Sequence, residues 1–417
     1  MGWATASRRR LIFWPGRWLM AWLVMLAVLF AGLGDAWRTG QADPWCWAVP
    51  MVAAMAVLGF ALRRSARWVG AGAVGMVLLL CGLAAARWPD PFAAVALAAL
   101  ALLAAVGGWA LRARRRAVGG VSIALAALLF WAAPDRAVRF GSDRPALAVI
   151  TALPLFWKEG QVGSEARFDG PTDAPIITVL RTRFTVRPID DPQALADSGA
   201  RRLLLAQPRA FSPAQMEGID QWVRGGGRAL VLADPLLRWP SDLPLGDRRR
   251  APSTSLLGPL LDHWGFQVRD RKDGEVRALM PDGRLVTLSG VQDFAMKGDD
   301  GALIARRRIG RGEVLVLGDA DLLDDRLWLA DPARPLDPRA WSADTPALLV
   351  HWLGGVDVPG DRRWMRLLPD VQAALRWALL LGTGWVILGG VVLGRGTARG
   401  AQEQKRDMDE RSRKEAG

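Results

Sequence analysis

Four polar residues that follow predicted strands are the side chains in this sequence best placed to do chemistry. Gln207 and Asp234 each follow a short apolar run, and Asp319 and Asp321 follow a third run in the segment GDADLLDD. In an open parallel sheet, ligands bind beyond the carboxyl ends of the strands. We therefore predict a candidate cleft at these four residues, where carboxylates could hold a ligand directly or through a metal ion.

A structural role competes with this interpretation and is favoured by the sequence. An aspartate in a strand-to-helix turn usually caps the helix that follows. The segment that begins at Asp319 also departs from a calcium-binding loop. Asp324 stands at the position of the sharp-turn glycine, and Ala330 stands at that of the closing glutamate. We therefore expect no catalytic residue, no bound cofactor and no metal, and the four cleft residues remain candidates only.

Motifs of common enzymes do not occur in the sequence. It contains no G-x-x-x-x-G-K-[ST] phosphate loop, no G-x-S-x-G serine motif, and no H-E-x-x-H or Cys/His zinc spacing. The three glycines at 225–227 follow a predicted helix, so they lie at the wrong end of its dipole for an anion. The two histidines, His263 and His351, each adjoin a tryptophan on an apolar segment, which predicts core or interface positions. These patterns favour a protein that is not an enzyme.

The first two cleft residues are positioned by a predicted strand–helix–strand unit at residues 203–235. Ser212 and Gln215 have the spacing of a capping box, and Pro213 suits the first helical position. Gly225 can adopt the left-handed conformation that ends a helix. The apolar runs on either side are short and bounded by turn residues, as in strands covered on both faces. The pattern predicts a parallel pair of strands joined by a helix.

The remainder of residues 134–373 extends this unit into a larger domain. A further alternation of strand and helix precedes residue 203, and two hairpins are predicted later, at residues 276–288 and 302–317. An alternating first half followed by hairpins is typical of a mainly parallel α/β sheet with an antiparallel extension.

Six apolar segments without a charged residue indicate transmembrane helices. Runs of about 20 such residues are long enough to cross a bilayer. Five of them occupy residues 18–133, and the sixth, at 377–393, lies in a predicted membrane region at 374–394. The first five run over residues 18–34, 45–62, 68–86, 92–111 and 117–133. The sequence therefore predicts a polytopic α-helical membrane protein of six spans with an inserted α/β domain.

Basic residues flank alternate ends of these segments and predict the topology. Arginine clusters precede the first segment, separate the second from the third, and separate the fourth from the fifth. By the positive-inside rule, residues 1–17 and 395–417 are cytoplasmic and the domain at 134–373 is extracytoplasmic. The net charge of +13 comes from these flanks and tails, because 33 basic and 33 acidic residues cancel between residues 134 and 370. Binding of nucleic acid is therefore not expected.

Three segments between residues 146 and 353 carry a family resemblance. They are LLLAQP, SPAQMEGIDQWVRGGGRALVLADP and GEVLVLGDADLLDD. Together they resemble the extracytoplasmic domain of GldG-like proteins, auxiliary components of ABC-type transport systems. The resemblance implies a flavodoxin-like or degenerate class I glutamine amidotransferase-like fold. Amidotransferase activity is not implied, because its cysteine nucleophile has no counterpart in a domain without cysteine. Five spans before the domain also depart from the family's usual arrangement and raise the alternative of a permease-like part.

These observations predict a multi-pass protein of the bacterial inner membrane with a periplasmic or extracellular domain. We expect a non-catalytic accessory or binding subunit of an ABC-type transport or envelope system. Its expected partners are membrane lipid, a separate ATP-binding subunit and other membrane subunits. Two alternatives remain, an envelope enzyme that uses the carboxylates at the sheet edge and a membrane scaffold or sensor.

Overall fold

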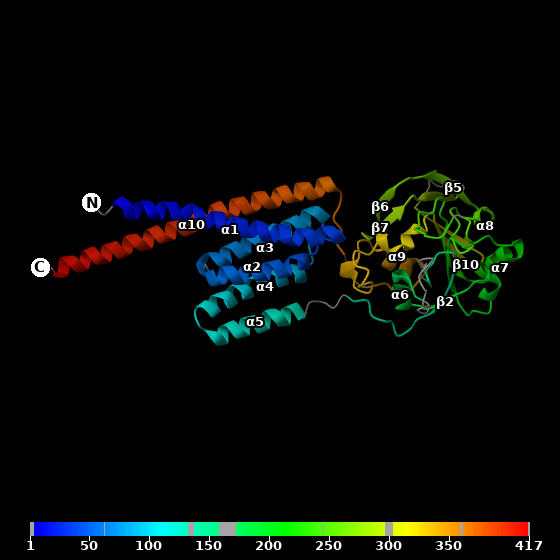
Figure 1. The fold of residues 1–417 in the computed structure, drawn as a ribbon, viewed down its shortest axis with the longest axis horizontal. Coiled ribbons are helices and arrows are strands. Elements are labelled where there is room, and N and C mark those ends of the chain that lie inside the picture. Colours follow the sequence, from blue (N-terminus) through cyan, green and yellow to red (C-terminus); the bar gives the residue numbers. More distant parts are fainter. Residues whose placement is uncertain are drawn as a thin grey trace. The chain divides into compact units, whose positions relative to one another are not determined.

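The chain forms two compact units in the computed structural model. The structure describes residues 4–61, 63–131, 137–157, 172–244, 246–296, 303–358 and 362–415. One unit comprises Met1–Asp135 with Arg362–Gly417, and the other comprises Arg136–Asp361. Figure 1 shows long helices in the first, here called the helical unit, and strands with shorter helices in the second, here called the α/β unit.

Five segments of the helical unit, counted over the described residues, are long and apolar enough to cross a membrane. They are Trp18–Thr39, Pro44–Ala61, Ser65–Ala85, Pro91–Arg112 and Leu368–Val392. The helices that contain them are α1 (Ala4–Thr39), η1 (Pro44–Trp47), α2 (Ala48–Ala61), α3 (Arg63–Ala85), α4 (Pro91–Arg112) and α10 (Leu368–Glu415). The span predicted at 117–133 forms α5 (Arg116–Trp131), a shorter apolar helix of 16 residues. Five of the six predicted spans are thus membrane-length helices.

Glycines allow α2 and α4 to pack closely. A Cβ atom added at Gly59 would lie 2.1 Å from the carbonyl oxygen of Ala105, and one added at Gly108 would lie 2.0 Å from that of Ala56. Small residues that let backbones approach in this way are a common basis of helix association in lipid. The α2–α4 contact therefore depends on the absence of side chains at these two glycines.

A pair of tryptophans joins α3 to α10. The rings of Trp68 and Trp385 stack with their centroids 4.4 Å apart. The indole N–H of each residue donates to the main-chain carbonyl of the other, at 3.1 Å and 2.8 Å. Polar groups in a bilayer must find such partners within the protein. The pair brings together helices that are distant in the sequence.

Six strands form the main sheet of the α/β unit in the order β2-β1-β3-β4-β10-β9. Every neighbouring pair is parallel except β9 and β10, so the mainly parallel sheet predicted from the sequence is confirmed. The strands are β1 (Ala146–Thr151), β2 (Thr185–Pro188), β3 (Arg202–Ala206), β4 (Arg228–Leu232), β9 (Ile304–Ile309) and β10 (Gly312–Leu317). In both β3 and β4, every residue after the first is buried, as expected for apolar strands in the middle of a parallel sheet.

Two small antiparallel pairs accompany the main sheet. Strand β5 (Phe266–Arg271) pairs with β8 (Gln292–Met296), and β6 (Glu275–Leu279) pairs with β7 (Leu285–Ser289). The hairpins predicted at 276–288 and 302–317 are present as β6–β7 and β9–β10. Strand β8 was not predicted, because its partner β5 is separated from it by a complete hairpin.

Helices cover both faces of the main sheet. On one face, α6 (Pro175–Arg181) and α9 (Thr345–Trp352) share an apolar core with the strands. On the other face, α7 (Pro213–Arg224) and α8 (Gly258–His263) contribute to a second core. Short 3-10 helices occupy several connections: η2 (Pro192–Leu195), η3 (Asp321–Leu323), η4 (Asp325–Leu327) and η5 (Pro338–Ala340). The result is a three-layer unit in which the loops at the carboxyl ends of the strands can form a site.

The predicted N-terminal cap of α7 is confirmed, whereas the predicted C-terminal residue is off by one position. Ser212 Oγ accepts a hydrogen bond from the Gln215 amide at 3.3 Å, and Gln215 Oε1 accepts one from the Ser212 amide at 2.9 Å. Gly225 keeps a helical φ of −69°, whereas Gly226 has a φ of +114°. The left-handed residue is therefore one position later than predicted, because Gly225 still closes a helical turn onto Gln221.

Candidate functional site

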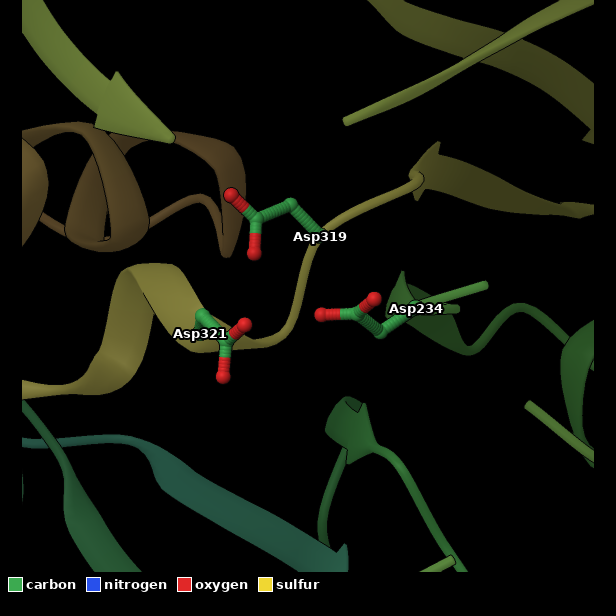
Figure 2. A group of neighbouring side chains, drawn as sticks. All are labelled: Asp234, Asp319 and Asp321. Atoms are coloured by element: carbon green, nitrogen blue, oxygen red, sulfur yellow. The ribbon is translucent and has the colours of Figure 1, made fainter. Parts of the chain in front are cut away.

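Three of the four predicted cleft residues meet at the carboxyl edge of the main sheet. Asp234 follows β4 and Asp319 follows β10, and these strands are parallel neighbours. Asp321 begins η3, two residues after Asp319. Figure 2 shows the three side chains converging, and each offers one carboxylate oxygen within 4.8 Å of the others. The three carboxyl groups therefore form one cluster, here called the aspartate cluster.

Backbone amides hold the cluster in place. Asp319 Oδ2 accepts from the Ser289 amide at 2.6 Å, and Asp321 Oδ2 accepts from the Arg238 amide at 2.7 Å. Both oxygens of Asp234 accept amides, from Leu236 at 2.8 Å and from Ala320 at 3.0 Å. The Oδ1 atoms of Asp319 and Asp321 are buried and have no hydrogen-bond partner in the structure.

The interpretation of these aspartates as helix caps is wrong for two of the cluster residues. The cap position of η3 belongs to Ala320, so neither Asp319 nor Asp321 caps that helix. Asp324 does act as a cap, since its Oδ1 accepts from the Arg326 amide at 3.0 Å at the start of η4. Helix η3 is a single 3-10 turn. The carboxyl groups of Asp319 and Asp321 instead accept amides from the end of β7 and from the loop after β4.

The cluster concentrates negative charge in a buried place. Asp234 and Asp319 are fully buried and Asp321 is 2% exposed. Burial, with the nearby Asp234 carboxyl, raises the pKa of Asp319 to about 8. Burial likewise raises the pKa of Asp321 to about 7 and raises that of Asp234. Within the described parts of the chain, no Lys, Arg or His side chain forms an ion pair with any of the three. The charge of Arg238 acts to lower the pKa of Asp321 but does not outweigh burial, so ionisation of the cluster is unfavourable unless a further cation compensates it.

The side chain of Gln207 forms hydrogen bonds with the main chain of Asp234. Gln207 Nε2 donates to the carbonyl oxygens of Asp234 at 3.3 Å and Pro252 at 3.0 Å, and Gln207 Oε1 accepts from the Asp234 amide at 3.1 Å. The side chain is fully buried, and the residue has a φ of +41°. Gln207 thus supports the loop that carries Asp234 through its main chain.

Neither histidine lies in the core, so that part of the sequence-based prediction is wrong, whereas an interface position stays a prediction. The side chain of His263 is 56% exposed and lies 3.5 Å from Asp220, and that of His351 is 46% exposed and lies 3.1 Å from Asp357. The apolar residues beside them are buried while the imidazoles point away from the core. A helix segment that looks apolar in sequence still has an outer face.

A second concave site lies where the strand order reverses. Strand β2 lies on one side of β1, and the next strand in the sequence, β3, lies on the other side of β1. The direction in which strands are added to the sheet therefore reverses between β1 and β3. A cavity of about 500 Å³ opens there, beyond the carboxyl ends of these strands. Side chains and loops that line it include Thr151, Trp157, Asp190, Arg209, Phe211 and Arg249. We call it the β1–β3 crevice, and it is where open α/β sheets bind ligands.

The sequence-based analysis missed this crevice. Strand ends can be recognised from sequence, but the switch point requires the spatial order of the strands. The two arginines and the aspartate of the crevice also come from three separate loops. A signal was available in the segment between β3 and α7, where Pro208, Arg209 and Phe211 stand next to the predicted strand end.

Comparison with known proteins gives one family match. Residues 144–293 match a family model described as "ABC-type uncharacterized transport system". All the residues that line the β1–β3 crevice fall within the matched segment, as do Gln207 and Asp234. Asp319 and Asp321 lie beyond it. No curated protein matches the chain.

Solved structures with some similarity are glycosidases. An exo-β-1,4-mannosidase from Opitutaceae bacterium strain TAV5 is 12% identical, with a TM-score of 0.31 over 60% of this chain and 40% of the enzyme. A β-galactosidase from Rahnella sp. R3 is 13% identical, with a TM-score of 0.29 over 64% of this chain and 43% of the enzyme. The chain spans less than half the length of either structure. TM-scores this low support no inference about fold or activity.

Proposed function

We propose that this protein is a non-catalytic, membrane-anchored accessory subunit of an ABC-type transport system. The α/β unit is its recognition platform, and the β1–β3 crevice is the surface that binds the partner or ligand. The observation that carries the proposal is the family match over residues 144–293, which contains the whole crevice. It agrees with the resemblance of the chain to GldG-like auxiliary components.

The membrane-length helices support the anchoring role. Five described segments have the length and apolar character of membrane spans. The sequence contains no phosphate-binding loop of the Walker type, so ATP hydrolysis would be supplied by a separate subunit. In this proposal the helical unit binds lipid and membrane partners, and the α/β unit recognises a component in the envelope.

The chemistry of the crevice suits a polar partner with an apolar part. Trp157 and Phe211 provide aromatic surface, whereas Arg209, Arg249 and Asp190 provide charges of both signs. Pockets that combine apolar walls with a few polar groups are typical binding sites. A protein segment or a small polar ligand would find both kinds of contact there.

Site-specific photo-crosslinking tests this proposal. A photoreactive phenylalanine analogue replaces Phe211 in the crevice or, as the matched control, Leu279, which is 54% exposed on β6. We expect the Phe211 position to crosslink a component of an ABC-type system in native membranes and the Leu279 position not to. Gentle solubilisation should also recover an ATP-binding subunit. An intact complex that contains no ABC component would contradict the proposal.

The proposed topology has six spans, with both termini cytoplasmic and the α/β unit outside the bacterial inner membrane. This requires α5 to cross the membrane. Its 16 residues extend about 24 Å at 1.5 Å per residue, against a hydrocarbon core of about 30 Å. The predicted span also includes Ala132 and Ala133, which lie outside the described residues. The topology therefore depends on this one helix.

Cysteine labelling decides between five and six spans. Single cysteines replace Ser7, Ser142 and Ser412 in turn, in a background without Cys46 and Cys81. If α5 crosses, a membrane-impermeant maleimide added outside labels position 142 and not positions 7 and 412. Labelling of positions 7 and 142 from the same side would show that α5 does not cross.

A further inference from the structure

The aspartate cluster is a set of converging oxygen donors that the proposed recognition role does not use. Asp234, Asp319 and Asp321 come from two neighbouring strand ends and one 3-10 turn, and one carboxylate oxygen of each lies within 4.8 Å of the others. All three are at least 98% buried. Three carboxyl groups brought this close away from solvent require an explanation.

A second observation concerns the hydrogen bonds of the cluster. Most of its oxygens are satisfied by backbone amides, which fix each carboxyl group in place. Asp319 Oδ1 and Asp321 Oδ1 have no partner, although both atoms are buried. A buried acceptor without a hydrogen bond destabilises the folded state, and more so when it is charged. These two buried oxygens of Asp319 and Asp321 are therefore available to a cation that displaces the protons of the cluster.

The geometry points to one hard divalent cation, bound by Asp234, Asp319 and Asp321, with Ca²⁺ the best fit. We propose this site as a feature of the protein that is independent of its recognition role. Carboxylate oxygens alone, without sulfur or imidazole, suit Ca²⁺, Mg²⁺ or Mn²⁺ and not softer metals.

The spacing of the donors admits Ca²⁺, and coordination geometry favours it over Mg²⁺. Two oxygens that each lie about 2.4 Å from Ca²⁺ can be separated by at most about 4.8 Å. For Mg²⁺, at about 2.1 Å, the limit is about 4.2 Å. The donor atoms lie within 4.8 Å of one another, so they satisfy the first limit without movement of the carboxyl groups. Ca²⁺ also accepts irregular coordination, whereas Mg²⁺ demands a near-ideal octahedron and loses its water ligands reluctantly. We therefore expect Ca²⁺ to bind more tightly than Mg²⁺.

The sequence-based expectation of no metal rested on two arguments that do not apply to this site. Asp319 and Asp321 do not cap a helix. The comparison with a calcium loop assumed ligands from one continuous segment, whereas Asp234 comes from a different strand. A cation would join β4 to β10 and to the turn that follows.

Metal binding to the full chain in detergent micelles tests the proposal. The protein is stripped with chelator and dialysed against Ca²⁺ or Mg²⁺, and bound metal is measured by elemental analysis. We expect about one Ca²⁺ per wild-type chain, and no stoichiometric Ca²⁺ for Asp319→Asn or Asp321→Asn. The matched control is Asp344→Asn, because Asp344 is equally buried and accepts an amide from Leu285 but lies outside the cluster.

Thermal unfolding provides the second measurement. Ca²⁺ should raise the Tm of the wild type and of Asp344→Asn, and should leave that of Asp319→Asn unchanged. Each asparagine keeps an oxygen for its backbone amide donor, and a cooperative melt of the metal-free variants checks their fold. The proposal is overturned if wild-type protein binds neither ion and shows no shift in Tm. Retention of one Ca²⁺ by the Asp319→Asn/Asp321→Asn double variant would also overturn it.

Discussion

Replacement of Gln207 tests whether this residue acts as a support for the sheet edge. Its buried side chain makes three hydrogen bonds, two to the main chain of Asp234 and one to Pro252. In Gln207→Ala, the Asp234 amide and the Pro252 carbonyl oxygen lose these partners. The Asp234 carbonyl oxygen keeps its bond from the Ser255 amide at 2.7 Å. At about 1–3 kcal/mol for each of these two groups left unpaired, we expect a loss of roughly 2–6 kcal/mol.

A second variant separates the hydrogen bonds from the backbone conformation. Gln207 has a φ of +41°, a region that glycine adopts without strain and other residues adopt at a cost. Gln207→Gly loses the same hydrogen bonds as Gln207→Ala but relieves that strain. We therefore expect it to be more stable than the alanine variant by about 1 kcal/mol, and less stable than the wild type.

Hydrogen–deuterium exchange of the full chain in detergent micelles measures these effects locally. Peptides that cover β3, β4 and the loop to Ser255 report the free energy of local opening. Gln193→Ala, at an exposed position on η2, is the matched control and should exchange like the wild type. The reasoning is refuted if Gln207→Ala leaves exchange in these peptides unchanged, or if the glycine variant opens more readily than the alanine variant.

Three further predictions concern the two units separately. Gly108→Ala should separate α2 from α4 and destabilise the helical unit by roughly 1–3 kcal/mol in a thermal melt. Gly120→Ala, where an added Cβ meets no atom within 4 Å, should not. Ser212→Ala should cost about 1 kcal/mol in local exchange of α7, and an unchanged rate would argue against the capping box. Burial alone would raise the pKa of Asp220, but hydrogen bonds from Arg224 and Trp264 outweigh it and lower that pKa. Because the folded pKa is below the unfolded one, this stabilisation is present above about pH 4 and is lost as the pH falls further. Between pH 4 and pH 3, wild type should lose stability more steeply than Asp220→Asn, and parallel curves would contradict the assignment.

Much of the architecture could be predicted from local patterns. The capping box of α7, the buried strands β3 and β4, and the hairpins β6–β7 and β9–β10 are all present where the sequence places them. Each depends on residues only a few positions apart, so the information is contained in a short segment. The same holds for the five long apolar helices, whose length and composition are properties of continuous sequence.

The site could be predicted only in part. Gln207, Asp234, Asp319 and Asp321 were correctly placed near strand ends, and the cleft predicted at these residues stays a prediction. Capping explains Asp324 and fails for Asp319 and Asp321, because a single 3-10 turn leaves those carboxyl groups free to reach other loops. The crevice between β1 and β3 was missed, since it exists only through the order of strands in space.

The sequence alone determined most of the strands, though not β8, as well as the apolar helices and the carboxyl ends of the main sheet. The tertiary structure decided that β4 and β10 are neighbours, which brings Asp234 to Asp319 from distant parts of the chain. It also decided that the side chain of Gln207 forms hydrogen bonds with the main chain of Asp234. Local periodicity and caps arise from interactions within a few residues, whereas strand order and buried charge depend on long-range packing, which no short segment encodes.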